Sequence, residues 1–142
     1  MADIHSKEVR SFNMSQVKGK DTKPELLVRK FLFGKGLRYR LYDKKLPGKP
    51  DIVLPKYKTV IFIHGCFWHG HENCKYAALP KTREEFWSEK IEGNKKRDKE
   101  NSKELKSKDW NVLIVYGCEL KKNNKDRTLQ NILKNIQNQF QN

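Results

Sequence analysis

The amino-acid sequence predicts an α/β domain in which a mixed β-sheet is flanked by helices. Short apolar runs separated by Pro and Gly turns fill residues 38–63, as expected for antiparallel strands. Two later stretches have apolar residues three and four positions apart, and they enclose one more apolar run at residues 110–116. A helical crossover therefore leads to a fourth strand. A chain of 142 residues is long enough to bury one core.

The chain opens with a polar, basic segment, residues 1–21, which we interpret as a DNA-contacting arm ahead of a single domain over residues 22–142. The first helix begins at Thr22, whose hydroxyl can cap it, and Glu25 completes a capping box. Gly34 marks its end. Glu25 is either only a cap or a carboxylate that faces a catalytic cleft, and the residues alone leave both open.

Three short strands follow, at residues 38–42, 51–54 and 59–63. The last two are separated by a tight turn that contains Pro55, which predicts a hairpin. Asp51 opens one strand of this hairpin and His64 closes the other. In an antiparallel pair joined by a short turn these two ends lie side by side. Asp51 is therefore expected near the loop that starts at His64.

The rest of the chain predicts a long loop, a helix, a strand and a last helix. Residues 64–81 lack periodicity and form a loop too long to hold its shape unaided. Thr82 and Glu85 predict a second capping box, from which a helix runs to about Ser107. Asp98 lies on the inward stripe of this helix and needs a partner there. We expect the strand at 110–116 in the sheet interior, and Asp126 as the cap of the last helix.

The charge balance points to nucleic acid. Lys and Arg outnumber Asp and Glu by 31 to 17, a net charge of +14. Such an excess attracts polyanions, of which nucleic acid is the commonest. The longest apolar run is far too short to span a bilayer, which argues against a membrane protein. Three cysteines without an apolar signal segment favour metal binding in a reducing cytoplasm over disulfides.

The cysteines and one histidine have the spacing of a zinc site. Cys66, His71 and Cys74 fall within nine residues, and Cys118 follows the fourth strand. Zn²⁺ takes four sulfur or nitrogen ligands, and a site with all four supplied by protein is structural. Such a site would tie the long loop to the end of the last strand. His69 is an alternative ligand to His71, and three reduced cysteines without metal are the simpler alternative.

Pro50-Asp51 is a candidate for a second, oxygen-based metal site, although Pro-Asp is also common in ordinary turns. Magnesium nucleases place a carboxylate at a strand end, beside a strand that supplies further oxygen ligands. In restriction nucleases Pro-Asp is followed by an Asp/Glu-x-Lys motif. Here Phe62 or Ile63 takes the acidic position and offers only a carbonyl oxygen, and His64 replaces the lysine.

His69 and Asp98 form a candidate catalytic pair. A neutral histidine that a carboxylate holds by one ring nitrogen is a competent general base for water, although a structural His–Asp pair is the alternative. Phe67 and Trp68 are hard to bury in a glycine-flanked loop, so we expect them to stack on bases or wedge between them. Trp87 lies on the inward stripe of its helix, so packing in the core is the favoured explanation for this residue.

Several separated motifs together resemble the very-short-patch repair (Vsr) DNA mismatch endonucleases. These motifs are Asn13-Met14, Lys20-Asp21-Thr22, Leu46-Pro47-Gly48-Lys49-Pro50-Asp51, His64-Gly65-Cys66-Phe67-Trp68-His69-x-His71, Thr82-Arg83-x-x-Phe86-Trp87-x-x-Lys90-Ile91, Asn94, Arg97-Asp98, and Val112-Leu113-Ile114-Val115 with Cys118. The resemblance covers about residues 8–120. It implies a restriction-endonuclease-like, PD-(D/E)xK-type fold. It also implies magnesium-dependent nicking of double-stranded DNA 5′ to the thymine of T:G mispairs, which arise when 5-methylcytosine deaminates, and a structural zinc.

The resemblance also implies roles for single residues. Asp51 and the Ile63 carbonyl would hold Mg²⁺, His69 would be the general base oriented by Asp98, and Glu25 and His64 would support them. The implied zinc ligands are Cys66, His71, Cys74 and Cys118. The implied DNA-intercalating residues are Met14, Phe67, Trp68 and Trp87.

Two other functions stay open at this point. A restriction-type endonuclease acting on matched duplex would keep the fold and the metal chemistry. A non-catalytic, zinc-stapled DNA-binding module would keep only the zinc and the charge. We expect the protein to act as a monomer, and the sequence leaves open whether it has a mismatch-repair protein as a partner.

Overall fold

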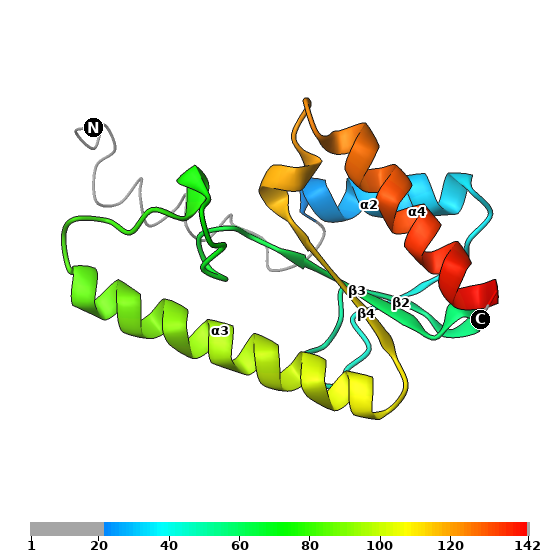
Figure 1. The fold of residues 1–142 in the computed structure, drawn as a ribbon, viewed down its shortest axis with the longest axis horizontal. Coiled ribbons are helices and arrows are strands. Elements are labelled where there is room, and N and C mark those ends of the chain that lie inside the picture. The colour runs from blue at the N-terminus through cyan, green and yellow to red at the C-terminus, as the bar shows by residue number, and fades with distance from the viewer. Residues whose placement is uncertain (1–21, 142) are drawn as a thin grey trace.

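The computed structural model describes residues 22–141, and side chains as far as residue 138. The expected N-terminal arm, with the candidate intercalating residue Met14, lies outside the described residues. The helices and strands in chain order are α2 (Lys23–Gly34), β1 (Arg40–Leu41), β2 (Ile52–Leu54), β3 (Thr59–His64), α3 (Glu84–Ser107), β4 (Asn111–Tyr116) and α4 (Lys125–Gln141) (Figure 1). Three 3₁₀ turns join them: η1 (Pro55–Tyr57), η2 (Lys75–Ala77) and η3 (Gly117–Leu120).

The four strands form one mixed sheet in the order β1-β2-β3-β4. The first three are antiparallel, and β4 runs parallel to β3 after the crossover through α3. The mixed sheet and its helical crossover are confirmed. The prediction that the fourth strand lies inside the sheet is wrong, because among the described residues β4 pairs with β3 alone. The inner positions belong to β2 and β3.

Helices cover both faces of this sheet, with α2 and α4 on one side and α3 on the other (Figure 1). The side chains of β3 alternate between the two layers. Ile61 joins Leu32 of α2 and Ile136 of α4 in one apolar cluster. Phe62 joins Leu105 of α3 in the other. Because both faces of β3 are covered, its sequence is apolar without alternation.

The helix starts differ from the expected caps in two places. Thr22 does cap α2, where its hydroxyl accepts a hydrogen bond from the Glu25 N–H at 3.5 Å. The capping box expected at Thr82 is wrong: Arg83, in the left-handed region with φ 58°, precedes α3 and no side chain caps it. Glu84 and Glu85 in the first turn complement the helix dipole instead. Asp126 lies within the first turn of α4 rather than ahead of it.

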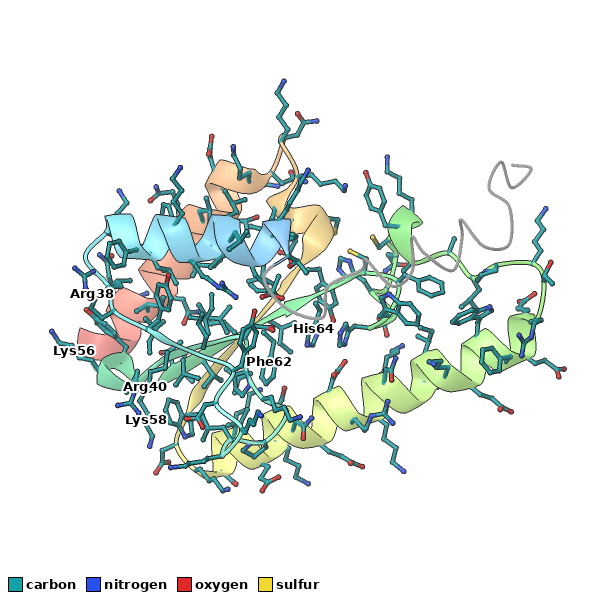
Figure 2. All side chains as sticks on the ribbon, turned by 180° about the vertical axis from the view of Figure 1, so that it is seen from behind. Arg38, Arg40, Lys56, Lys58, Phe62 and His64 are labelled. Carbon is teal, nitrogen blue, oxygen red and sulfur yellow. The ribbon has the colours of Figure 1, made fainter. Side chains whose placement is uncertain are left out.

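Basic side chains are not confined to one end of the molecule. Arg38, Arg40, Lys56 and Lys58 lie at the end of the sheet remote from His64 (Figure 2). Three of these cations lie over aromatic rings: the guanidinium of Arg38 is 4.2 Å from the Phe33 ring centre, Lys58 Nζ is 4.4 Å from that of Trp110, and Lys56 Nζ is 5.8 Å from that of Tyr57. Part of the positive charge therefore shields apolar surface at this end of the sheet.

Candidate active site and metal centre

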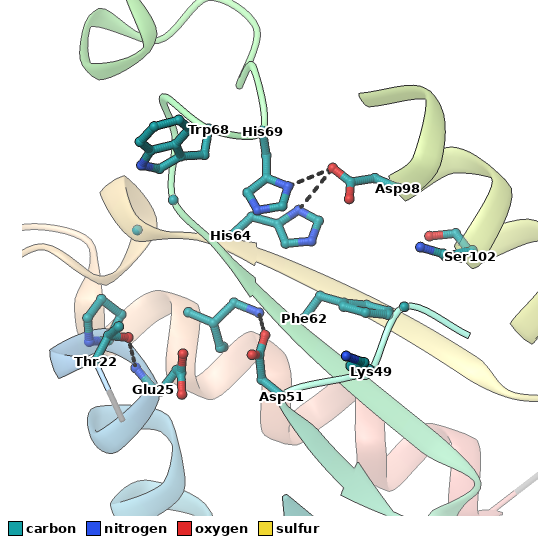
Figure 3. A pocket seen from close by; sticks show the side chains of 16 residues that line it. Thr22, Glu25, Lys49, Asp51, Phe62, His64, Trp68, His69, Asp98 and Ser102 are labelled. Atoms are coloured by element: carbon teal, nitrogen blue, oxygen red, sulfur yellow. Dashed lines mark hydrogen bonds and ion pairs between the residues drawn. The ribbon is translucent and has the colours of Figure 1, made fainter. Parts of the chain in front are cut away.

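A cleft of about 520 Å³ opens where β2 begins and β3 ends (Figure 3). Different elements supply its polar side chains: α2, the residue before β2, the end of β3, the loop that follows, and α3. The structure brings every candidate catalytic and magnesium-binding position to this one cleft, namely Glu25, Asp51, Ile63, His64, His69 and Asp98. The hairpin explains the meeting of the two strand ends, and the crossover helix brings Asp98 over them.

Asp51 is held at the strand end by the neighbouring strand. The Ile63 N–H donates a 2.7 Å hydrogen bond to Asp51 Oδ2. The N–H and C=O of one strand residue point to the same side, so the Ile63 carbonyl faces the side of the strand on which Asp51 lies. Burial raises the pKa of Asp51 to about 6, and the nearby Glu25 carboxylate adds to this against the lowering effect of the Ile63 hydrogen bond. Oxygen donors gathered around a partly buried carboxylate are the set that Mg²⁺ prefers.

Glu25 is buried and fixed by two residues that the sequence did not single out. Its Oε2 accepts a 3.0 Å hydrogen bond from Arg29 Nη2 and another from the Tyr42 hydroxyl. Tyr42 adopts a left-handed backbone with φ 50°, which is uncommon for an aromatic residue. The i, i+4 spacing of Glu25 and Arg29 could have revealed the first contact. Tyr42 gives no sequence signal, because a loop conformation brings it to Glu25.

Two histidines and a carboxylate form the opposite side of the cleft (Figure 3). His69 Nδ1 lies 2.7 Å from Asp98 Oδ2, so the contact with Asp98 uses Nδ1 and not Nε2 of that ring. The His64 ring stacks on the His69 ring with centroids 3.7 Å apart and planes 5° apart. Burial, together with the neighbouring His69, lowers the pKa of His64 to about 4, so this ring is neutral at pH 7. A carboxylate-oriented imidazole with a neutral ring stacked on it has the geometry of a general base.

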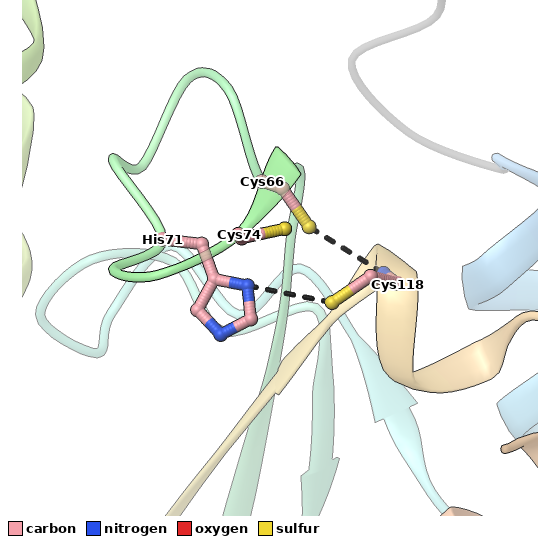
Figure 4. A group of neighbouring side chains, drawn as sticks. All are labelled: Cys66, His71, Cys74 and Cys118. Atoms are coloured by element: carbon pink, nitrogen blue, oxygen red, sulfur yellow. Dashed lines mark hydrogen bonds between the residues drawn. The ribbon is translucent and has the colours of Figure 1, made fainter. Parts of the chain in front are cut away.

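Three cysteines and His71 form a separate cluster beside the cleft (Figure 4). The ligand atoms of Cys66, His71, Cys74 and Cys118 all lie within 4.8 Å of one another. His71 Nδ1 is 3.4 Å from Cys118 Sγ, whereas His69 is hydrogen-bonded to Asp98. A tetrahedral Zn²⁺ with Zn–S bonds of about 2.3 Å and Zn–N bonds of about 2.1 Å separates its ligand atoms by distances similar to those observed here. Three sulfurs and one imidazole nitrogen so arranged fit Zn²⁺.

The electrostatics of the cluster also favour a cation. Burial, together with the adjacent Cys66 and Cys74 sulfurs, raises the pKa of Cys118 to about 12, in part because thiolates so close together repel each other. A divalent cation between the sulfurs would offset that repulsion. The cluster joins the loop after β3 to the turn after β4, and His69 lies in the loop between Cys66 and His71.

The candidate intercalating aromatics of the described chain lie together. Phe67, Trp68 and Trp87 contact one another edge to face, with ring centroids 5.2 to 5.8 Å apart. Phe86 extends the group, with its ring centroid 5.1 Å from that of Trp87. Phe86 is not among the site residues predicted from the sequence, although its place next to Trp87 in the sequence could have indicated it. Trp68 and Phe86 are 38% and 43% exposed. An aromatic cluster that is partly exposed beside the cleft offers stacking surface to bases.

Gly70 fixes how closely the loop approaches α3. It has φ +58°, and a Cβ at this position would lie 2.6 Å from Ile91 Cγ2 and 2.7 Å from Lys95 Cδ. We therefore predict that Gly70→Ala lowers the free energy of unfolding by about 1–3 kcal/mol through strain and overpacking. Gly34→Ala is the matched control, since Gly34 ends α2 with nothing within 4 Å of its Cβ position. Chemical denaturation of both variants tests this, and equal stabilities would contradict it.

Within residues 22–141, no helix has the length and apolar character needed to cross a membrane.

Comparison with known proteins places the chain among DNA-cleaving enzymes. Residues 2–75 match the family described as "DNA mismatch endonuclease Vsr". The chain is 54% identical over 121 residues to the type II nicking enzyme V.NmeAIP of Neisseria meningitidis serogroup A, a match that covers 85% of this chain and 86% of that protein. It is 46% identical over 121 residues to the DNA mismatch endonuclease Vsr of Escherichia coli K12, covering 85% and 77%.

The fold and these relatives define the class first: the protein is a DNA endonuclease, a hydrolase that acts on DNA. Within that class, the chain belongs to the Vsr family of DNA mismatch endonucleases. The restriction-endonuclease-like core implied by the sequence motifs is confirmed by this membership together with the four-stranded mixed sheet.

Proposed function

We propose that the protein is a magnesium-dependent endonuclease that nicks double-stranded DNA 5′ to the thymine of a T:G mispair. The observation that carries the proposal is the meeting, in one cleft, of the Asp51–Ile63 strand ends with the His69–Asp98 pair. The aromatic cluster next to the cleft supports a substrate whose base stack must be opened. The names of the relatives, a mismatch endonuclease and nicking enzymes, support the reaction and the single-strand outcome.

Asp51 and the carbonyl of Ile63 would hold Mg²⁺, with the buried Glu25 carboxylate adding negative charge nearby. The bound ion would polarise the scissile phosphate. Arg29 and Tyr42 hold Glu25 in place and limit how far its carboxylate can turn. These contacts keep the oxygen donors of the cleft preorganised.

His69 would take the proton from the attacking water at Nε2. Asp98 keeps the proton of the neutral ring on Nδ1 and stabilises the imidazolium that forms. The water oxygen would then attack the phosphorus in line with the leaving oxygen. His64 is neutral and stacked, so it holds the His69 ring plane without adding a competing charge.

Phe67, Trp68 and Trp87 would open the duplex at the mispair. A mismatched step stacks and pairs less well than a matched one, so unstacking it costs less free energy. Lys90 Nζ lies 5.9 Å from the Trp68 ring centre, which places a cation beside the proposed wedge for phosphate contact. Asn94 Nδ2 donates a 2.8 Å hydrogen bond to the Trp68 carbonyl and fixes the backbone of the wedge on α3.

The zinc cluster would fix the loop that carries His69. We predict that Cys118→Ser, which removes the ligand most distant in sequence, lowers the zinc content from one equivalent per chain and loosens residues 64–81. Elemental analysis measures the metal, and limited proteolysis measures the loop. Ser88→Ala is the control: it is a similarly small substitution on α3, outside the cluster, and should keep the full equivalent of zinc. Retention of a full equivalent of zinc by Cys118→Ser would contradict this assignment.

The raised pKa of Asp51 predicts a pH-dependent stability. The folded protein binds the Asp51 proton more tightly than the unfolded chain, so this group stabilises the fold at low pH and the contribution is lost as pH rises from about 4 to about 6. Asp51→Asn, which is uncharged but can still accept the Ile63 hydrogen bond, should therefore unfold at a higher temperature than wild type at pH 7.5. Added Mg²⁺ should raise the melting temperature of wild type only. Equal responses to Mg²⁺ would contradict Asp51 as its ligand.

A plasmid assay tests the proposed reaction. A supercoiled plasmid with one T:G mispair should become open circular when protein and Mg²⁺ are present, and should not become linear. A matched plasmid should stay supercoiled. Linear product from both plasmids would favour the restriction-type alternative, and a gel shift without any cleavage would favour the DNA-binding module. Because the chain carries a net charge of +14, the salt must be near physiological to suppress non-specific binding.

A further inference from the structure

The two histidines of the cleft present the same ring nitrogen to one carboxylate oxygen. His69 Nδ1 is 2.7 Å from Asp98 Oδ2, and His64 Nδ1 is 4.0 Å from the same oxygen. Because the rings are stacked and nearly parallel, the two Nδ1 atoms lie side by side toward α3 (Figure 3). The three ligand atoms lie within 4.8 Å of one another.

His64 brings an unused nitrogen to this group. The residue is only 5% exposed, and its Nδ1 has no hydrogen-bond partner within the described part of the chain. A buried polar atom without a partner costs free energy, so a group that satisfied it would be bound favourably. An imidazole nitrogen that lies beside a carboxylate and a second imidazole is a common donor to transition metals.

We propose that His64, His69 and Asp98 form a binding site for a divalent transition cation such as Zn²⁺ or Ni²⁺, and that occupation of this site inhibits the enzyme. Two imidazoles and one carboxylate suit such cations, whereas Mg²⁺ prefers oxygen donors. Bonds of about 2.1 Å at tetrahedral or right angles separate ligand atoms by roughly 3.0–3.4 Å. The observed 2.7 and 4.0 Å lie on either side of that range, so small movements of the two rings would admit the ion.

The inhibitory consequence rests on the proposed function. Coordination through His69 Nδ1 would replace its hydrogen bond to Asp98 and leave the ring proton on Nε2. That nitrogen then has no lone pair to take a proton from water. Asp51 is not a ligand of this site and lies elsewhere in the cleft, so Mg²⁺ would not compete for it directly (Figure 3). An enzyme with a cysteine-rich zinc cluster would thus be switched off by excess free zinc.

Calorimetric titration of the zinc-loaded protein with Ni²⁺, without DNA or Mg²⁺, tests the site itself. We expect one Ni²⁺ bound per chain, with affinity lowered at least tenfold in His64→Ala and in Asp98→Asn. Asp51→Asn is the matched control in the same cleft and should bind Ni²⁺ as wild type does. A zinc indicator establishes that Ni²⁺ has not displaced the cysteine-bound metal, and thermal melting identifies any variant that fails to fold. Absence of this binding, or its retention in folded His64→Ala or Asp98→Asn, would overturn the site.

Inhibition is measured separately, by nicking of a T:G duplex in saturating Mg²⁺. The rate should fall with added Ni²⁺ at the concentration that half-fills the calorimetric site, and more Mg²⁺ should not restore it. Nicking that continues when the site is filled would overturn the inhibitory role. A protein that binds Ni²⁺ as expected but never nicks DNA would support the site and contradict the proposed function, so the two failures are distinguishable.

Discussion

Asp51→Ala should reduce the rate of magnesium-dependent nicking by on the order of a thousandfold or more, because a metal that polarises the phosphate contributes several kcal/mol to the transition state. The structure holds this carboxylate where β2 begins and β3 ends, with its Oδ2 hydrogen-bonded to the Ile63 N–H. Its removal should weaken Mg²⁺ binding and leave affinity for DNA close to that of wild type. Single-turnover nicking over a range of Mg²⁺ concentrations measures the first effect, and a gel shift measures the second.

Asp126→Ala is the control for this variant, since it removes a carboxylate from the first turn of α4, outside the cleft. It should nick at the wild-type rate. A loss of less than tenfold in Asp51→Ala, with unchanged Mg²⁺ dependence, would mean that the metal is held elsewhere.

His69→Ala should lower the nicking rate by about 10²–10⁴-fold, the range typical of a lost general base. Asp98→Asn should cause a smaller loss, because His69 would remain but its tautomer would no longer be fixed by the 2.7 Å hydrogen bond. Both variants should still bind the T:G duplex.

Added imidazole provides a further test of His69. A small base that fits the space left by the ring should restore part of the rate of His69→Ala and none of the rate of Asp51→Ala. If His69→Ala nicks within about threefold of wild type, the His69–Asp98 pair is structural and the water is activated by another group.

Much of this arrangement could be predicted from local sequence. The hairpin around Pro55 predicts that Asp51 and His64 approach each other, because a short antiparallel connection leaves no other choice. The 3.6-residue period of α3 predicts that Asp98 faces inward. The spacing of Cys66, His71 and Cys74 predicts one end of the metal cluster, and the placement of Cys118 after a neighbouring strand completes it.

The remaining features depend on tertiary contacts that no local pattern encodes. Tyr42 contacts Glu25 from a loop, and its backbone there lies in the left-handed region. The helix α3 starts after Arg83, whose backbone is left-handed, and not at the capping signal of Thr82. A side-chain cap contributes only about 1 kcal/mol to helix stability, so the conformation of the preceding loop outweighs it. The edge position of β4 depends on which strands are available to pair with it, and sequence periodicity carries no information on that.

The most direct measurement is a nicking assay that compares an end-labelled duplex carrying one T:G mispair with the same duplex carrying T:A. At near-physiological salt with Mg²⁺, the account predicts one cut, on the thymine strand, immediately 5′ to the mispaired thymine, and none in the T:A duplex. Equal cutting of the two duplexes, or cutting of both strands of the mispaired one, would contradict it.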